Sequence, residues 1–442
     1  MLSIDPTLQE KILDLIQREV VPATGCTEPV AVALTTAHAA DALGQDNPDE
    51  LKQIKVLLSP NVLKNALGVG IPGTGMIGLP IAIALGTVIA APEKQLTVLE
   101  GFSNDQLLRA KKLVESGVID IAVKPGDVDK LYIEVIITDK KGEEASAIIA
   151  GTHTRLVSLK HNGKELNTAP TESCGTSESQ TNDTEDPKLT FDLVYNFAME
   201  MPLEKIEFIM EAARLNKAAS EASMQTRYGH AVGRMIKGDL GLKYLGQSSL
   251  TNMLSATSAA CDARMDGAPF TVMSNSGSGN QGITATLPVL TFAQEQECTH
   301  EQTVRALMLS NLMVIYIKQK LGRLSALCGC VVASTGASCG LTYLLGGSRA
   351  QTGYAIKNMV GNITGMLCDG AKPSCSLKVS SGVSTAMLSA LLAMEGSVVT
   401  SNEGVVDDDI DRTVDNLTNI GKEGMSATDK LVLDIMTSKK HA

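Results

Sequence analysis

Two cysteines, Cys368 and Cys375, enclose six residues in the stretch Cys368-Asp-Gly-Ala-Lys-Pro-Ser-Cys375. Gly370 and Pro373 favour a turn over a continuous helix, so both thiols can converge on a metal. Cys328 lies upstream and is a third thiol for the same site. We interpret this set as part of an iron–sulfur site. The alternative is free cysteines packed as small hydrophobic residues, because Cys-x6-Cys is not a familiar zinc or ferredoxin spacing.

Another cysteine, Cys26, lies in the turn Gly25-Cys-Thr-Glu-Pro29, directly before a run of small apolar residues. Thr27 is a good N-cap and Pro29 suits a first turn, so we expect a helix to begin just after Cys26. Backbone N–H groups and the helix dipole stabilise a thiolate there and lower the pKa of the thiol. The carboxylate of Glu28 would oppose that shift if the two side chains approach. Cys26 and Glu28 are therefore our candidate catalytic residues.

A polar loop, Ser274-Asn-Ser-Gly-Ser-Gly-Asn-Gln-Gly282, precedes an apolar segment. Its glycines free backbone N–H groups to point inward, and its Ser and Asn side chains add donors, which suits the binding of a carboxylate. The alternative is a flexible turn. The candidate substrate-binding residues in this loop are Ser274, Asn275, Ser276, Ser278 and Asn280.

Two further features are less specific. His153, in Gly151-Thr-His-Thr154, follows a predicted strand, where a histidine is more often structural than catalytic; we retain it as a candidate for substrate binding. The stretch Gly73-Thr-Gly-Met-Ile-Gly78 matches the dinucleotide fingerprint formally, but a helical segment, not a strand, precedes it. We interpret it as a loop that lets the backbone approach another element or a small ligand.

The composition restricts both the fold and the partners. A chain of 442 residues exceeds one ordinary core, so two or three domains are expected. Hydrophobic residues make up 44% and aromatic residues only 3%, which favours close packing of helices through small side chains. The net charge of -11 offers no basic face for nucleic acid or anionic lipid. Nine cysteines without a secretory signal indicate reduced thiols in a cytoplasmic protein.

The chain divides into three predicted segments. Residues 1–165 combine N-terminal helices with a smaller α/β domain, residues 166–190 form a polar linker, and residues 191–442 form a larger all-helical domain, so the fold class is α+β, or mixed. The uncharged stretches 65–92 and 324–347 are too interrupted by glycine or polar residues to span a membrane. The predicted strands are 54–58, 96–99, 119–123, 132–138 and 147–149. The predicted helices are 5–20, 103–116, 203–224, 248–265, 299–321, 323–345, 350–366, 376–395 and 427–438.

Four motifs occur together in this order: the Gly25–Pro29 turn, the Ser274–Gly282 loop, Cys328 within Leu-Cys-Gly-Cys, and the Cys368–Cys375 pair. This set resembles the L-cysteine desulfidase family, whose larger C-terminal domain is similar to the alpha chain of iron–sulfur L-serine dehydratases. The resemblance covers nearly the whole chain apart from the linker. It implies an oxygen-labile [4Fe-4S] cluster with one open iron, held by Cys328, Cys368 and Cys375. The family's proposed catalytic base is the cysteine of the turn, here Cys26.

The residue types agree with the chemistry of that family. An open iron is a Lewis acid that can bind the leaving group of a β-substituted amino acid, while a thiolate removes the Cα proton. The resemblance implies a lyase that converts L-cysteine to pyruvate, ammonia and hydrogen sulfide without pyridoxal phosphate. The Ser274–Gly282 loop would hold the substrate carboxylate, and Lys372 or Lys378 would add positive charge. We expect a homodimer, with no nucleic-acid or membrane partner.

Other interpretations remain open. An iron–sulfur L-serine dehydratase would expel water by the same elimination, although the Ser-Ser-Ser-His-Thr type of motif of its β domain is absent from the N-terminal half. A non-catalytic iron–sulfur sensor would need a partner surface, and a zinc-stabilised structural protein would differ in its metal. Among the ligands, Cys330 lies two residues after Cys328 and would point elsewhere on a helix. Cys339 lies three turns after Cys328 on the same side, and is a further candidate ligand.

Overall fold

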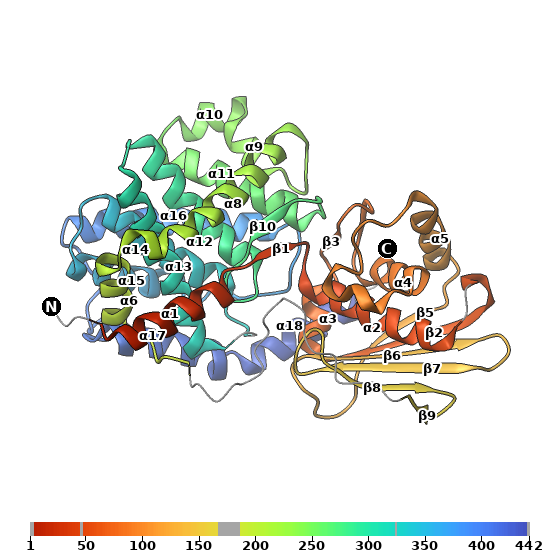
Figure 1. Cartoon of the computed structure of the whole chain (residues 1–442). Helices are drawn as coiled ribbons and strands as arrows, with labels where there is room; N and C mark the ends of the chain where they lie inside the picture. Colours follow the sequence, from red (N-terminus) through yellow and green to blue (C-terminus); the bar gives the residue numbers. More distant parts are fainter. Residues whose placement is uncertain (1–3, 45–46, 167–185, 323–324, 440–442) are drawn as a thin grey trace.

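The computed structural model describes residues 4–44, 47–166, 186–322 and 325–439. Cys174 and most of the predicted linker lie outside these ranges. Figure 1 shows two bodies side by side, a smaller one built on a sheet and a larger one built from helices. We call them the sheet body (residues 27–166) and the helical body (residues 186–424). The predicted α+β class, with a large helical part, is confirmed.

The sheet body contains one six-stranded sheet in the order β5-β2-β6-β7-β8-β9. β2 and β5 are parallel, whereas every other pair of neighbouring strands in this sheet is antiparallel. Every second residue of β6 is buried, as expected for a sheet with one covered face. The strands are β2 (Leu51–Leu58), β5 (Ile119–Val123), β6 (Tyr132–Asp139), β7 (Glu144–Ala150), β8 (Leu156–His161) and β9 (Lys164–Glu165).

The helices of the sheet body cover one face of this sheet (Figure 1). They are α2 (Thr27–Leu43), α3 (Pro60–Ala66), α4 (Leu79–Ile89) and α5 (Asn104–Glu115). α2 lies between the sheet and α4, which explains why it is apolar on every side. The predicted strand 96–99 is wrong: Pro92–Thr97 forms a 3-10 helix, and the apolar Val98 and Leu99 are buried without joining the sheet.

The helical body confirms the helices expected at 248–265, 299–321, 350–366 and 376–395. The helix expected at 323–345 begins at Gly329, the one expected at 203–224 is divided by a 3-10 turn at residues 207–209, and α6, α9, α10, α12 and α17 were not among the predicted helices. The helices of this body are α6 (Phe191–Glu200), α7 (Leu203–Ile206), α8 (Met210–Gln225), α9 (Val232–Lys237), α10 (Asp239–Leu245), α11 (Ser249–Met265), α12 (Gly279–Glu295), α13 (His300–Leu321), α14 (Gly329–Leu344), α15 (Arg349–Ile363), α16 (Cys375–Met394) and α17 (Ile410–Asn419). Small residues let these helices approach closely: a β-carbon at Gly336 of α14 would lie 2.4 Å from the carbonyl oxygen of Ser310 in α13. The composition rich in small side chains therefore produces tight helix contacts.

Both ends of the described chain cross the junction between the bodies. The first helix, α1 (Pro6–Glu19), packs its apolar side into the core of the helical body, whereas Leu433 of the last helix, α18 (Ser426–Ser438), joins the core of the sheet body. Between α1 and α2, the short strand β1 (Pro22–Thr24) pairs antiparallel with β10 (Thr271–Met273) of the helical body. These crossings hold the start of α2 at the junction within a single chain.

The glycine-rich stretch 73–78 is part of the same junction. After α3 the chain forms a two-residue strand, β3 (Gly70–Ile71), and residues 73–78 contain the turn that leads back into its partner β4 (Met76–Ile77). The amide of Gly73 donates to the carbonyl oxygen of Gly267, just beyond α11. The expected close backbone approach is therefore confirmed.

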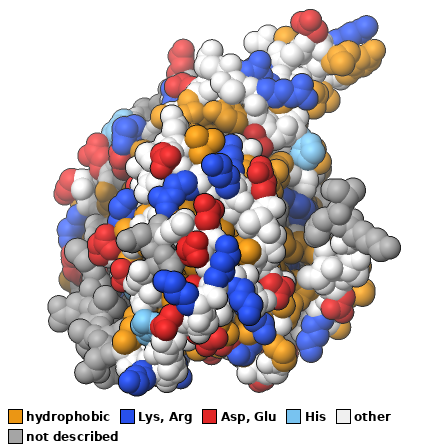
Figure 2. Space-filling model, turned by 90° about the vertical axis from the view of Figure 1, so that its right-hand side faces the viewer, with side chains coloured by type: hydrophobic (Ala, Val, Ile, Leu, Met, Phe, Trp, Pro, Cys, Tyr) orange, Lys and Arg blue, Asp and Glu red, His pale blue; other side chains and the backbone are white. Residues whose placement is uncertain are grey.

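The charge of the surface and the hydropathy of the helices bear on the expected partners. Figure 2 shows acidic and basic side chains interspersed on the face that the sheet body presents. Among the described residues, one helix, α16, is long and apolar enough to cross a membrane. It packs against α11, α14 and α15, and 44% of its apolar stretch is buried within the protein.

Substitution of Gly70 by Ala should destabilise the junction. A β-carbon at position 70 would lie 2.2 Å from the carbonyl carbon of Asp266, so the two segments would have to separate. We expect the free energy of unfolding to fall by about 1–3 kcal/mol, measured by chemical denaturation. Gly365→Ala is the control, because a β-carbon there meets no atom within 4 Å; it should change stability by less than about 0.5 kcal/mol. Equal stability of the two variants would contradict the tight contact.

Candidate functional site

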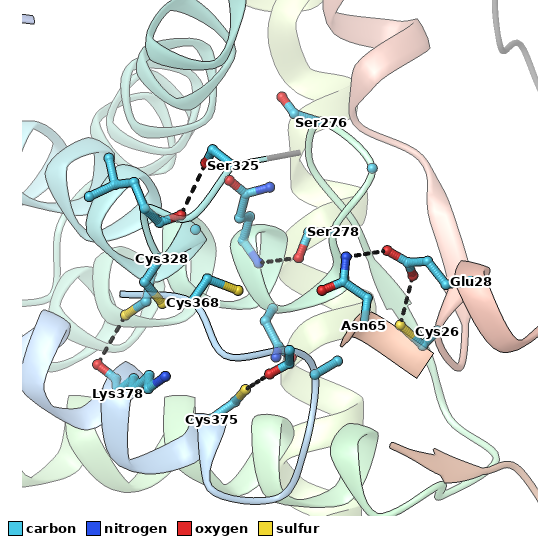
Figure 3. A pocket seen from close by; sticks show the side chains of 18 of the residues that line it. Cys26, Glu28, Asn65, Ser276, Ser278, Ser325, Cys328, Cys368, Cys375 and Lys378 are labelled. Carbon is cyan, nitrogen blue, oxygen red and sulfur yellow. Dashed lines mark hydrogen bonds between the residues drawn. The ribbon is translucent and has the colours of Figure 1, made fainter. Parts of the chain in front are cut away.

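A cavity of about 150 Å³ lies where the two bodies meet. Figure 3 shows side chains from both bodies pointing into it, with Cys26 and Glu28 on one side and Cys328 and Cys368 on the other. Its polar and thiol-bearing lining residues are Cys26, Glu28, Asn61, Lys64, Asn65, Arg264, Ser276, Ser278, Asn280, Gln281, Lys318, Ser325, Cys328, Cys330, Cys368, Cys375 and Lys378. The four motifs found in the sequence therefore converge on one space.

Backbone pairing holds two of the thiols next to each other. The amide of Cys328 donates to the carbonyl oxygen of Met366 at 2.9 Å, and the amide of Cys368 donates to that of Ala326 at 2.6 Å. These bonds, with a bridge between Leu327 and Leu367, make a short antiparallel contact. Cys328 is also the N-cap of α14, so it precedes the helix instead of lying within it. Its side chain is therefore fixed at the cavity wall.

The third thiol belongs to the first residue of α16. The turn before Cys375 contains Gly370 at φ +87°, and a β-carbon at this glycine would lie 2.1 Å from the carbonyl oxygen of Lys64 in α3. Only glycine fits such a turn so close to the other body. Lys378, one turn into α16, donates to the carboxylate of Asp369 and to the carbonyl oxygen of Leu367 at 3.0 Å. The ammonium of Lys378 thus faces the turn that carries the thiols.

The thiols are buried, and they influence one another. Burial and the nearby Cys368 raise the pKa of Cys328 to about 12, while the charge of Lys378 opposes this rise. Burial also raises the pKa of Cys375, again against the opposing charges of Lys372 and Lys378. In the absence of a cation, the neutral thiols are therefore favoured. A bound metal would reverse this preference, because metal ligation requires thiolates.

On the opposite side, Cys26 and Glu28 form a hydrogen-bonded pair. Cys26 is the N-cap residue of α2, and its Sγ donates to Oε2 of Glu28 at 3.0 Å. Nδ2 of Asn65 in α3 donates to Oε1 of the same carboxylate at 3.1 Å. The amide thus orients the carboxylate, and the carboxylate orients the thiol. Asn65 was not among the candidates from the sequence.

The electrostatics of Cys26 differ from the simple helix-terminus expectation. Burial, followed by the negative charge of Glu28, raises the pKa of the Cys26 thiol well above its usual range; the guanidinium of Arg264 opposes the rise. Glu28 therefore opposes the lowering of the Cys26 pKa that the helix terminus alone would cause, as expected, and burial raises this pKa further. The thiol is protonated at neutral pH and has a carboxylate in place to accept its proton.

The loop between β10 and α12 divides into a lining part and a supporting part. Ser276, Ser278 and Asn280 line the cavity, and Ser276 adopts φ +48°, a strained value for a residue other than glycine. Ser274 instead donates to the carbonyl oxygen of Val21 at 2.7 Å. The buried Asn275 donates to Asn311 at 3.0 Å. These two residues hold the loop against its neighbours and do not line this cavity.

Two other sequence candidates lie outside the cavity. His153 is in the turn between β7 and β8 of the sheet body, away from the lining residues. Lys372 turns back to the carbonyl oxygen of Asp369 at 2.6 Å. The geometry gives no support to either residue as a substrate ligand. Among the further cysteines, Cys330 lines the cavity but donates to the carbonyl oxygen of Lys378, and Cys339 is buried elsewhere in α14.

Arg264 and Gln281 are lining residues that were missed in the sequence. Arg264 lies near the end of α11, where Nη2 donates to the carbonyl oxygen of Gly25 at 3.0 Å and Nη1 donates to Oδ1 of Asn280 at 3.2 Å. The sequence contained a signal for Arg264, because an arginine near the end of a helix made mostly of small residues is expected to be buried with its charge. Gln281 directly follows the predicted Ser and Asn residues of the loop.

Known proteins related to this chain match most or nearly all of it. Residues 93–434 match the family described as serine dehydratase alpha chain. A UPF0597 protein of Porphyromonas gingivalis is 66% identical over 438 residues, which cover 99% of this chain and 100% of that protein. UPF0597 proteins of Parabacteroides distasonis and Oleidesulfovibrio alaskensis are 58% and 44% identical, over 99% and 97% of this chain and 100% and 98% of theirs. The chain therefore belongs to the serine dehydratase alpha chain family.

Proposed function

We propose that this protein is a lyase that eliminates sulfide from L-cysteine, giving pyruvate, ammonia and hydrogen sulfide. The observation that carries the proposal is the pairing, in one cavity, of the thiols of Cys328, Cys330, Cys368 and Cys375 on one wall with the Cys26–Glu28 pair on the other. Family membership supports the coarser assignment to a serine-dehydratase-like lyase. The choice of cysteine rests on the sequence resemblance.

The thiol wall fits a cluster better than a single ion. Among the described residues, no three His, Cys, Asp or Glu side chains converge closely enough to hold one metal ion. Cys328, Cys368 and Cys375 instead surround part of the cavity, and a [4Fe-4S] cluster bound by three thiolates spans a larger space and leaves one iron open. Such a cluster would supply a Lewis acid for the departing sulfur. The side chain of Lys378 adds positive charge beside these thiolates.

Residues of the protein would remove the Cα proton and orient the substrate. Glu28 orients the Cys26 side chain through their 3.0 Å hydrogen bond, and the thiolate form of Cys26 would remove the Cα proton of the substrate. Asn65 keeps the carboxylate in place during this transfer. Backbone and side-chain donors of residues 276–278 and Asn280, which line the cavity, would orient the substrate. The buried walls exclude bulk water, which strengthens each of these interactions.

L-Serine dehydration is the second candidate, favoured by membership of the serine dehydratase alpha chain family. The same cavity would serve, with water in place of sulfide as the product of elimination. The sequence departs from serine dehydratases in lacking the Ser-Ser-Ser-His-Thr type of motif in its N-terminal half.

Anaerobic reconstitution tests the function and the cofactor together. We expect about four irons and matching acid-labile sulfide per chain, with hydrogen sulfide and pyruvate released from L-cysteine faster than pyruvate from L-serine. Cys368→Ala should lose both the iron and the activity. Cys339→Ala is the matched control, because this buried thiol does not line the cavity, and it should keep both.

Each alternative gives a distinct result in this experiment. Pyruvate from serine alone would replace the desulfidase by a dehydratase. A reconstituted protein with iron but without activity on either amino acid would favour a sensor. Zinc in place of iron would remove the basis of the proposed elimination.

The Cys26–Glu28 pair predicts a pH dependence for alkylation of Cys26. Because its pKa is raised, the thiolate fraction stays small near pH 7 and grows as pH rises toward that pKa, so the rate with iodoacetamide should increase about tenfold per pH unit up to pH 9. Glu28→Gln removes the opposing negative charge and should speed the reaction at each pH. Peptide mass spectrometry measures it, with Cys298 as the internal control. A plateau below pH 8 would contradict the raised pKa.

A further inference from the structure

Arg264 is a buried cation of the cavity with no acidic partner among the described residues. Arg264 is 6% exposed, and among the described residues its guanidinium makes no ion pair and its Nε has no hydrogen-bond partner. Its two hydrogen bonds go to the neutral oxygens of Gly25 and Asn280. A buried guanidinium without an anion is costly, and it retains unused N–H donors. Both features point to an anionic ligand.

The lysines of the cavity are already engaged. Lys64 forms an ion pair with Asp429 of α18 at 2.5 Å, and Lys378 pairs with Asp369. Lys318 also takes part in an interaction within the protein. Arg264 is therefore the lining cation best placed to receive an anion from outside. The planar guanidinium also matches a carboxylate better than an ammonium does, because it can donate two parallel hydrogen bonds.

A glycine lets the guanidinium of Arg264 pack closely against the start of α12. A β-carbon at Gly279, the first residue of α12, would lie 2.2 Å from Nε of Arg264. Glycine at this position therefore lets the arginine lie against the start of the helix. The positive end of the α12 dipole adds to the attraction for a negative group.

A second unpaired group lies next along the loop. Gln281 is 3% exposed, and its Nε2 donates to the carbonyl oxygen of Asn275 at 3.2 Å. This bond fixes the amide orientation, because a carbonyl oxygen can only accept, and it leaves Oε1 as the free end. Oε1 has no partner among the described residues, and a β-carbon at Gly329 would lie 3.2 Å from it. An acceptor in this position suits an N–H donor from a ligand.

We propose that Arg264 binds the carboxylate of the substrate and that Gln281 accepts a hydrogen bond from its ammonium group. The cavity would then select free α-amino acids over their amides and N-acylated derivatives. This inference rests on the proposed function, since it assumes that the substrate binds in this cavity. Arg264, and not the hydroxyl groups of the Ser274–Gly282 loop, would then be the main ligand of the substrate carboxylate.

Binding of L-alanine tests this proposal separately from catalysis. L-Alanine has no leaving group, so it can bind to the anaerobically reconstituted protein without elimination. We expect calorimetry to show L-alanine binding at least about tenfold more tightly than L-alaninamide, which lacks the negative charge, and than N-acetyl-L-alanine, which lacks the ammonium group. Equal affinities for L-alanine and L-alaninamide, or no binding of L-alanine, would overturn the proposal.

Variants assign the two roles. Arg264→Gln should weaken binding of L-alanine by about tenfold to a hundredfold and abolish its advantage over L-alaninamide. Arg264→Lys should recover part of the affinity. Gln281→Leu should abolish the advantage of L-alanine over N-acetyl-L-alanine. Iron content and circular dichroism confirm that each variant is folded.

An alternative role for Arg264 gives a different result. If the guanidinium acts only on Cys26, Arg264→Gln would slow alkylation of Cys26 and leave the affinity for L-alanine unchanged, which would overturn the proposal. Failure of the proposed function is seen separately. Arginine-dependent binding of L-alanine, without product from L-cysteine or L-serine, would retain the amino-acid site and reject the elimination.

Discussion

The antiparallel pairing of β1 with β10 is the contact on which the rest of the site depends. β1 joins α1, which packs in the helical body, to α2, which is part of the sheet body. The pairing places Cys26 at the boundary, and beyond it the same backbone contact continues to the polar loop, where the amide of Ser274 donates to the carbonyl oxygen of Val21. A thiol of one body and a ligand loop of the other are thus held in register by main-chain bonds. Such bonds do not depend on side-chain rotamers, so the geometry is fixed before any ligand binds.

Burial governs the chemistry of this boundary. It raises the pKa values of Cys26 and Cys328, and it leaves the charge of Arg264 without an acidic partner among the described residues. Burial of thiols and of an unpaired guanidinium lowers the stability of the folded protein, and binding of a cofactor or substrate that pairs with these groups would offset this cost. Glu28 is the exception, because three donors already satisfy its carboxylate. It therefore serves as an internal partner for the thiol, while Arg264 remains available to a ligand.

Much of this architecture could be predicted from the sequence, because local patterns carry it. The helices after Phe191 follow from long runs of Ala, Leu and Met, and the turn before Cys375 follows from its Gly and Pro. The strand expected at 96–99 failed since apolar residues at the edge of a core can be buried without sheet pairing. Asn65 and Arg264 were not predicted, because each depends on contacts between segments far apart in the chain. His153 was a candidate because histidine is often catalytic, but it lies in the turn between β7 and β8 and does not line the cavity.

The most direct test of the account is the activity of a Cys26→Ala variant that still holds its cluster. The account predicts unchanged iron content and a loss of sulfide release from L-cysteine of about a hundredfold or more, because the base has been removed across the junction from the metal. Cys261→Ala should remain active, since this buried thiol does not line the cavity. Near-normal sulfide release from Cys26→Ala would contradict the claim that the two bodies form one active site through this thiol.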